Sequence, residues 1–263
     1  MADFSGKVVI LTGAAGGVGR AIGRALGAQG AKVVAVGRTA ATLEAALTEV
    51  RSAGGDGVAV AGEVADPATA GRAVAAAVCL GGVDVLINNA AVGYSFESSR
   101  PGSMGVLSAT TPELWREVID INLNGAANMT HAALPELLKR GGEGANIVFI
   151  ASIMGLHGNR SAHAYAAAKA GLMNLTQGLA LTHGPQGLRT NCVAPGLIDT
   201  EMVGDIMASK PFDNPATRYA ISPLGRAARP EEIANAALFL ASPAASYING
   251  AVLAVDGGSS AGG

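Results

Sequence analysis

The N-terminal part of the chain places an apolar strand, a glycine-rich turn and a helix directly after one another. The run Lys7-Val-Val-Ile-Leu-Thr12 is apolar and rich in β-branched residues, which is typical of a buried parallel strand. It leads into Gly13-Ala-Ala-Gly-Gly-Val-Gly19, and a helical pattern begins at Arg20. A glycine-rich turn can be nothing more than a turn, but one between a parallel strand and a helix lays a pyrophosphate against the helix N-terminus. The sequence therefore predicts a dinucleotide-binding α/β fold.

Three glycines of this turn have different expected roles. Gly13 allows the tight turn after the strand, Gly17 allows close approach to the backbone, and Gly19 allows the helix to pack closely on the strand. With Val18 between the last two, they form the predicted pyrophosphate site.

The rest of the chain alternates strand and helix patterns. Apolar runs predict strands at residues 7–12, 32–36, 57–61, 83–87, 146–150, 188–193 and 251–255. Helical periodicity is present at residues 19–29, 40–53, 67–79, 112–138, 161–183 and 231–241. This alternation predicts a doubly wound parallel sheet of the Rossmann type, with about seven strands and helices on both faces. We expect one domain over residues 1–263, in which the long irregular segments 92–111 and 197–225 form the substrate walls.

A tyrosine and a lysine four residues apart carry the strongest chemical signal. On a helix, this spacing puts the phenol of Tyr165 and the ammonium of Lys169 on one face. A neighbouring ammonium favours the phenolate and lowers the pKa of the phenol. With the hydroxyl of Ser152, thirteen positions upstream, the group fits reduction of a ketone or oxidation of a secondary alcohol. By itself the pair also fits an exposed helix face, since the pattern is weak.

Taken with further motifs, the chain resembles the short-chain dehydrogenase/reductase family. The spacing of the first turn is Thr-Gly-x-x-x-Gly-x-Gly, and the later motifs follow in the order of the family: Asn88-Asn89-Ala90-Ala91, Asn122, Ser152, Tyr165, Lys169 and Pro195-Gly196. The resemblance covers nearly the whole length, to Val255-Asp256-Gly257-Gly258. Two features depart from the family pattern. Ala91 stands where glycine is usual, and the segment 92–111 is about ten residues longer than usual.

The resemblance implies roles for individual residues. Tyr165 would be the acid/base, Ser152 would orient the substrate oxygen, and Lys169 would bind the nicotinamide ribose and tune the tyrosine. Asn122 would help to hold a proton-relaying water, although it could also cap a local turn. Residues implied to line the cofactor are Glu63 and Val64 at the adenine, then Asn89 and Ala90, and then Pro195, Gly196, Ile198 and Thr200 at the nicotinamide. Pro195-Gly196 could equally be only a turn.

The end of the second strand bears on the choice of cofactor. NAD-specific folds usually place an acidic residue there, whereas this chain has Gly37 and Arg38. A guanidinium next to a glycine can pair with a 2′-phosphate, which favours NADP over NAD. The alternative is a solvated arginine. Gly16 weakens the NADP interpretation, because NADP-preferring members often have a second basic residue there.

Composition narrows the possible partners and locations. The net charge of −2 without a basic stripe argues against nucleic acid, and no apolar stretch is long enough for a membrane span. The N-terminus has no secretory pattern, so we expect a cytoplasmic protein. Cys79 and Cys192 and the four histidines form no ligand pattern, so we expect no metal and two buried thiols. The 49% hydrophobic content and small residues in the helices 112–138 and 161–183 favour a homotetramer, the assembly that the family resemblance implies.

Apolar residues near the predicted site indicate the kind of substrate. They are Tyr94, Phe96, Met154, Leu156, His157, Met202, Met207 and Phe212. If they line a pocket, a small cyclic or aryl ketone fits better than a free sugar, although such residues serve packing as often as recognition. A 3-oxoacyl-carrier-protein or sugar dehydrogenase remains an alternative; for the carrier protein, the segment 181–186 lacks the basic residues that an acidic partner needs. An isomerase or lyase with bound nicotinamide, or a non-catalytic dinucleotide-binding regulator, also remains open.

Overall fold

The computed structural model describes residues 4–141, 144–203 and 222–262, and its strands form one parallel sheet. The strand order is β3-β2-β1-β4-β5-β6-β7, and every neighbouring pair is parallel. The strands are β1 (Val8–Thr12), β2 (Lys32–Gly37), β3 (Asp56–Ala61), β4 (Val85–Asn88), β5 (Asn146–Ile150), β6 (Arg189–Pro195) and β7 (Val252–Val255). The predicted fold class is confirmed, and the strand bounds agree within two residues at every end.

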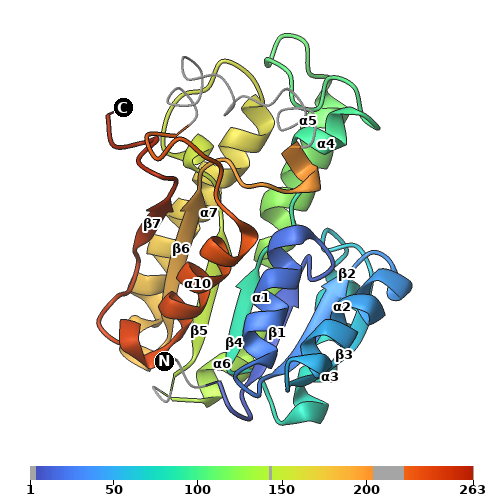
Figure 1. Ribbon diagram of the computed structural model, residues 1–263, viewed down its shortest axis with the longest axis vertical. Helices are drawn as coiled ribbons and strands as arrows, with labels where there is room; N and C mark the ends of the chain where they lie inside the picture. The colour runs from blue at the N-terminus through green and yellow to red at the C-terminus, as the bar shows by residue number, and fades with distance from the viewer. Residues whose placement is uncertain (1–3, 142–143, 204–221, 263) are drawn as a thin grey trace.

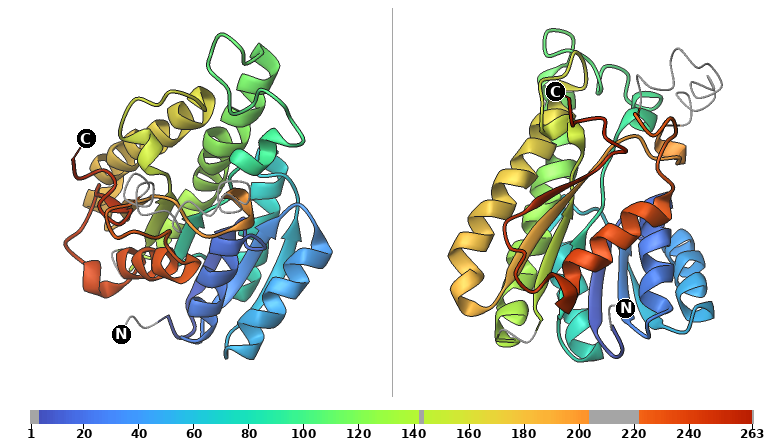
Figure 2. Two further views of the ribbon diagram at one scale, coloured as in Figure 1. Left: turned by 45° about the horizontal axis from the view of Figure 1, so that its top comes forward. Right: turned by 60° about the vertical axis from the view of Figure 1, so that its left-hand side comes forward.

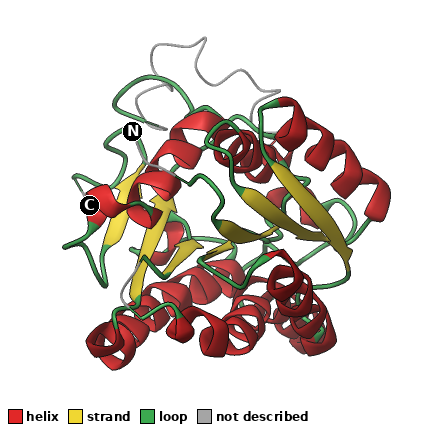
Figure 3. Ribbon diagram, turned by 90° about the horizontal axis from the view of Figure 1, so that it is seen from below, coloured by secondary structure: helices red, strands yellow, loops and turns green. Residues whose placement is uncertain are grey.

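Helices cover both faces of this sheet, as Figure 3 shows from below. One face carries α1 (Gly17–Gly27), α2 (Ala40–Ser52) and α10 (Pro230–Ala241); the other carries α3 (Pro67–Leu80), α6 (Gly125–Lys139) and α7 (His163–His183) (Figures 1 and 2). Successive residues of β1 feed the two cores alternately: Val9 and Leu11 pack under α1, while Val8 and Ile10 pack on the opposite side. Burial on both faces explains the continuous apolar runs in the sequence.

The sheet reverses its winding between β1 and β4. After β3 the chain returns to the other side of β1, so the crossovers before and after this point lie on opposite faces. In such sheets the divergence leaves a crevice at the carboxyl ends of the two strands. The segments after β4, β5 and β6 gather at that end, at the top of Figure 1.

The helix predicted at 112–138 is three elements in one continuous path. It begins with α5 (Pro112–Ile119), widens to a π-helical turn at Asp120–Asn124, and continues as α6. The Thr111 side chain caps its start by accepting from the Leu114 backbone N–H at 3.3 Å. A π turn has no compositional signature, so periodicity could not reveal it; such turns often occur at functional sites.

Of the two segments expected to be irregular, 92–111 is partly helical, and 197–225 is described only in part. Residues 92–111 contain the short helix α4 (Tyr94–Glu97) and a series of hydrogen-bonded turns. The later segment is described up to the short helix Glu201–Val203 and again from Ser222. Two of the predicted pocket residues, Met207 and Phe212, lie outside the described residues.

The expectation of two buried thiols is wrong for one cysteine. Cys192 is buried in β6, but Cys79 is exposed in the last turn of α3, on the side of that helix away from the sheet. Neither cysteine is in a disulfide. Among the described residues, no helix has the length and apolarity that crossing a membrane requires.

Candidate active site

Close neighbours leave no free space for a Cβ at three glycines of the turn. Gly13 has a φ of 64°, in the left-handed region, and a Cβ there would lie 2.8 Å from the Ala90 Cα. A Cβ on Gly19 would lie 2.0 Å from the Gly13 carbonyl oxygen. A Cβ on Gly17 would come within 2.9 Å of the Thr200 methyl group. The turn, β4 and the segment after β6 therefore meet closely at the crevice.

The start of α1 is suited to a phosphate group. Its N-cap residue, Gly16, provides no side-chain acceptor, and its first turn contains no acidic residue. The first N–H groups of a helix lack intrahelical partners and carry the positive end of the helix dipole. The residues present thus fit the pyrophosphate of a dinucleotide.

Thr12 is a functional residue that the sequence analysis did not assign. Its buried hydroxyl accepts from the Asn89 N–H at 2.9 Å and from the Ala90 N–H at 3.0 Å. The Asn89 side-chain amide donates back to the carbonyl oxygens of Thr12 and Gly13, both at 3.1 Å. These four hydrogen bonds join the ends of β1 and β4, which fixes the floor of the crevice. The available signal was the threonine directly before the first glycine.

The end of β2 presents an open arginine. Gly37 ends the strand, and the Arg38 side chain is exposed, with no hydrogen bond or ion pair to any other residue that the structure describes. One strand further, Val64 is buried against Gly125, whereas Glu63 is exposed. This end of the crevice therefore has a guanidinium available for an anion, with the Glu63 carboxylate exposed one strand further.

Tyr165, Lys169 and Ser152 come together where β5 meets α7. Lys169 is 1% exposed, and its ammonium donates to the Ile150 carbonyl oxygen at 3.0 Å and lies 5.4 Å from the Tyr165 ring centroid. Ser152 begins the turn after β5, accepts from the Met154 N–H at 3.2 Å, and is within hydrogen-bond reach of Tyr165. The predicted spacing thus corresponds to a cluster of side chains in which Lys169 is buried and Tyr165 is half-buried, and the pair does not lie on an exposed helix face.

The expected lowering of the tyrosine pKa is not what this arrangement produces. Burial raises the pKa of Tyr165 to about 12, although the hydrogen bond with Ser152 opposes the change. Burial also lowers the pKa of Lys169 to about 8. The reason is geometric: the ammonium lies over the ring face and donates to Ile150, so removal from water dominates both groups.

Asn122 lies in the π-helical turn and is 1% exposed. Its side chain accepts from the Val92 N–H at 3.3 Å and donates to the Val118 carbonyl oxygen at 3.0 Å. The residue thus ties the α5–α6 path to the segment that follows β4. Both the local bonding considered as an alternative and a position at the crevice are present, and the role in holding a water stays a prediction.

The segment after β6 closes one side of the crevice. The Gly196 N–H donates to the Val255 carbonyl oxygen at 3.1 Å, and a Cβ on Gly196 would lie 2.9 Å from the Asp256 Cα. A short β-bridge then pairs Ile198 with Ala228. Its two backbone hydrogen bonds join Ala228 to Leu197 and Asp199, the neighbours of Ile198. Thr200 follows at the glycine turn, as the contact with Gly17 requires. Pro195-Gly196 is therefore more than a local turn.

The predicted substrate residues fall into two groups. Tyr94 contacts Met154, with 3.9 Å between hydroxyl and sulfur, and a Cβ on Gly93 would meet the Met202 sulfur at 2.8 Å. A small core outside the sheet brings Phe96 and Met154 to Tyr165. Its buried members are Met104, Val118, Ala162 and Ala164, and Phe96, Trp115, Met154 and Tyr165 are partly buried against it. Leu156 and His157 are instead exposed.

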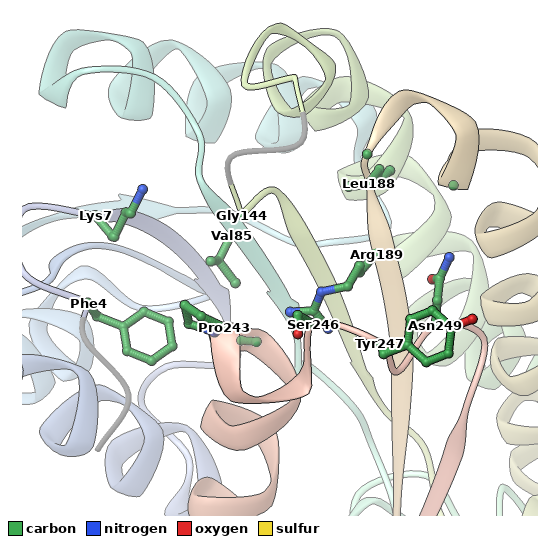
Figure 4. Close-up of a pocket in the computed structure, with 13 residues that line it drawn as sticks. Phe4, Lys7, Val85, Gly144, Leu188, Arg189, Pro243, Ser246, Tyr247 and Asn249 are labelled. Atoms are coloured by element: carbon green, nitrogen blue, oxygen red, sulfur yellow. The ribbon is translucent and has the colours of Figure 1, made fainter.

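A cavity of about 730 Å³ lies at the other end of the sheet (Figure 4). Its lining includes Lys7 and Arg189, which lie at the amino ends of β1 and β6. The Arg189 guanidinium donates to the carbonyl oxygens of Leu240, Ser242 and Ile248, so it serves the fold. Ligands of open α/β sheets bind at the carboxyl ends, and this cavity is therefore not the reaction site.

A parallel sheet with an open phosphate-binding turn and a Ser–Tyr–Lys cluster at its crevice defines a dinucleotide-dependent oxidoreductase. Comparisons with known proteins agree. A family model described as enoyl-(acyl carrier protein) reductase matches residues 13–260. The cis-4-hydroxycyclohexanecarboxylate dehydrogenase of Sinomonas cyclohexanicum is 41% identical over 97% of each chain.

Solved structures give the same result. A short-chain type dehydrogenase/reductase from Mycobacterium ulcerans matches with a TM-score of 0.87 and 29% identity, over 98% of this chain and 90% of that one. Levodione reductase matches with a TM-score of 0.87 and 32% identity, over 98% and 99% of the two chains. The chain belongs to the short-chain dehydrogenase/reductase family. It is an NAD(P)-dependent oxidoreductase that acts on CH–OH groups.

Proposed function

We propose that the protein interconverts a small cyclic secondary alcohol and its ketone, with NADP favoured over NAD. The observation that carries the reaction is the convergence of Ser152, Tyr165 and Lys169 at the crevice beside the phosphate-binding turn. When bound, the nicotinamide supplies or accepts the hydride. The side chains then have to orient the substrate oxygen and move one proton.

In the direction of reduction, the Tyr165 hydroxyl donates its proton to the carbonyl oxygen as the hydride reaches the carbonyl carbon. The Ser152 hydroxyl hydrogen-bonds the same oxygen and holds it in line. One N–H of the Lys169 ammonium donates to the Ile150 carbonyl oxygen, and the remaining N–H groups can bind the ribose hydroxyls. After the transfer, the Lys169 ammonium would return a proton to the Tyr165 phenolate. Asn122, fixed in the π turn, would hold the water that replaces the proton on the lysine.

The residues that would hold the cofactor lie along the crevice. The pyrophosphate would lie over Gly13, Gly17, Val18 and Gly19, and the floor under the cofactor would be Asn89 and Ala90. Glu63 and Val64 would flank the adenine, and Pro195, Gly196, Ile198 and Thr200 would flank the nicotinamide. The open guanidinium of Arg38 beside Gly37 supports a 2′-phosphate, and hence NADP.

The substrate class is supported by the apolar side chains at the crevice. Phe96 and Met154 pack in the same small core as Tyr165. Tyr94 contacts Met154, and Met202 lies at Gly93. None of these side chains carries a charge that would bind an ionic substrate. The name of the Sinomonas relative refers to a hydroxylated cyclohexane ring, which is consistent with this substrate class. A 3-oxoacyl-carrier-protein substrate is the second candidate, favoured by the 35% identity to the 3-oxoacyl-[acyl-carrier-protein] reductase of Escherichia coli over 97% of this chain.

We also propose a cytoplasmic homotetramer. Ala166, Ala167 and Ala170 on α7 reach the surface, whereas other small residues, such as Ala133 and Ala168, pack against the chain's own sheet. The edge strand β7 is half-exposed, and Leu253 on it is 37% exposed. An exposed apolar edge strand is usually covered by a partner. Two free cysteines fit a reducing compartment.

The test is turnover with a panel of cyclic and acyclic ketones and alcohols, followed by the absorbance of reduced nicotinamide. Tyr165→Phe should lower kcat by about 100-fold or more and leave cofactor affinity nearly unchanged, because only proton transfer is lost. Tyr247→Phe is the matched control, since that tyrosine is fully exposed at the far cavity. Retention of more than about a tenth of the wild-type rate by Tyr165→Phe would refute the assignment. Binding of the cofactor without turnover of any substrate would instead favour a non-catalytic dinucleotide-binding regulator.

A further inference from the structure

The segment 92–111 is organised around one carboxylate. Glu97, at the end of α4, accepts from the Gly102 N–H at 2.6 Å, from the Met104 N–H at 2.7 Å and from the Ser103 hydroxyl at 3.2 Å. These donors lower the pKa of Glu97, so the carboxylate is charged at neutral pH. Glu97 with its three donors is called the Glu97 clamp below. It fixes the path of the chain from Gly102 to Met104.

The residues held by the clamp bind the start of the catalytic helix. The Met104 carbonyl oxygen accepts from the Ala162 N–H at 2.8 Å, and the Gly105 carbonyl oxygen accepts from the His163 N–H at 3.3 Å. The Leu107 N–H donates to Nδ1 of His163 at 3.0 Å, so a third bond joins the two segments. The N-cap of α7 has no side-chain cap of its own. The segment 92–111 therefore replaces the usual capping side chain.

The first residue of this junction is in a conformation that needs support. Ala162 has φ 53° and ψ 41°, and it is the non-glycine residue with positive φ in the described part of the chain. Residues with a Cβ disfavour this region, and such a conformation persists only where its surroundings hold it. Ala162 is fully buried, against Met104 in the small core that also contains Tyr165. Tyr165 follows three residues later, in the first turn of α7.

We propose that Glu97 is a positioning residue for Tyr165, acting through Met104 and the left-handed Ala162. The clamp fixes Met104, whose carbonyl oxygen accepts from the Ala162 N–H, and Ala162 sets the direction in which α7 presents the phenol to the substrate. The inference rests on the proposed role of Tyr165 as acid/base. It gives the long segment a function in catalysis beyond that of a substrate wall.

The experiment compares Glu97→Gln with Glu117→Gln in the folded full-length enzyme. Glu117 pairs with Arg100 at 3.1 Å on the surface of the same region and is the matched control. The two backbone N–H groups donate to different oxygens of Glu97, and in Glu97→Gln one of these oxygens becomes an NH2 group, so one N–H loses its acceptor. Glu97→Gln should lower kcat by about tenfold to a hundredfold, because small misplacements of a reacting group have effects of this size. Cofactor affinity should stay within about twofold of wild type, as should kcat of Glu117→Gln.

Two readouts separate positioning from a general loss of stability. Burial raises the pKa of Tyr165, so a looser site should move the high-pH loss of ketone reduction to lower pH in Glu97→Gln alone. Glycine adopts a positive φ freely, so adding Ala162→Gly to Glu97→Gln should restore kcat by about threefold or more relative to the effect of Ala162→Gly in wild type. A purely structural role of Glu97 would lower the unfolding temperature and move neither readout.

The outcomes are distinguishable from failure of the proposed function. Wild-type kcat in Glu97→Gln, or a loss of kcat without rescue by Ala162→Gly, overturns the inference while Tyr165→Phe remains inactive. Activity of Tyr165→Phe would instead overturn the role of the tyrosine. If Glu97→Gln does not fold, Glu97→Asp keeps the charge on a shorter side chain, and the same kcat, pH and rescue criteria apply to it.

Discussion

A methyl group on Gly19 is the sharpest test of the phosphate-binding turn. A Cβ at this position would lie 2.0 Å from the Gly13 carbonyl oxygen and 2.9 Å from the Ala14 Cα. Both neighbours are backbone atoms, so no flexible side chain can move aside. Ordinary contact needs about 3.5 Å, and the turn and the helix must therefore separate by more than about 1 Å.

The expected size of the effect follows from two opposing contributions. Overpacking costs about 1–3 kcal/mol, and this overlap belongs at the upper end of that range. Alanine favours a helix over glycine by about 1 kcal/mol, and Gly19 lies inside α1. The clash is the larger contribution and leaves a loss of about 2 kcal/mol. For a chain of this length that corresponds to a fall in Tm of about 4–8 °C.

Gly16→Ala is the matched control. A Cβ there would lie 3.6 Å from the Gly13 carbonyl oxygen, an ordinary contact, and Gly16 has a negative φ of −80°. Thermal unfolding followed by circular dichroism should give a Tm for Gly16→Ala close to that of wild type. Because the N–H groups of α1 move with the helix, Gly19→Ala should also weaken NADP(H) in a fluorescence titration by more than about tenfold. A Gly19→Ala protein with wild-type Tm and affinity would refute the packing described for the turn.

Three further predictions concern cofactor, pH and assembly. Arg38→Ala should weaken NADP(H) by about tenfold to a hundredfold and NAD(H) much less, with Arg51→Ala as the control; equal effects on both cofactors would show that Arg38 does not contact the phosphate. Oxidation needs Tyr165 deprotonated, reduction needs it protonated, and burial raises the pKa of Tyr165. The kcat for oxidation should therefore rise with pH above neutrality, whereas the kcat for reduction should fall only as the pH approaches the pKa of Tyr165. The same pH optimum for both directions would contradict this. Light scattering at micromolar concentration should give about four times the 26.0 kDa chain mass, and a stable monomer would exclude the tetramer.

The sheet could be predicted because each of its strands has a recognisable pattern in its own short stretch of sequence. A parallel strand buried on both faces must be apolar throughout, so Val8–Thr12 and Asn146–Ile150 are visible as runs between polar turns. Gly13 and Gly19 could be assigned because a tight turn and a close helix contact exclude a Cβ. Tyr165 and Lys169 could be paired because helical spacing puts them on one face.

Other features depend on contacts between distant segments and could not be predicted in this way. The pKa of Tyr165 is set by how much water its surroundings exclude, and helical spacing does not contain that quantity. The π turn at Asn122 is stabilised in part by the Val92 N–H, which belongs to another segment. Cys79 is exposed because it lies on the outer side of α3. The sequence of this helix is rich in alanine on all sides, so it does not show which side faces the sheet.

The structure of segment 92–111 could not be predicted from the sequence, although its unusual length could be seen there. Its extra length was visible in the sequence, but its order depends on Glu97 meeting backbone donors five to seven residues later. Its carbonyl groups then meet a helix that begins more than fifty residues further along the chain. If this segment forms the proposed substrate wall, the wall cannot move independently of Tyr165, because it is bonded to the start of α7. Substitutions that reshape this wall for another substrate should therefore also change proton transfer, unless they leave the bonds from Met104 and Gly105 to α7 intact.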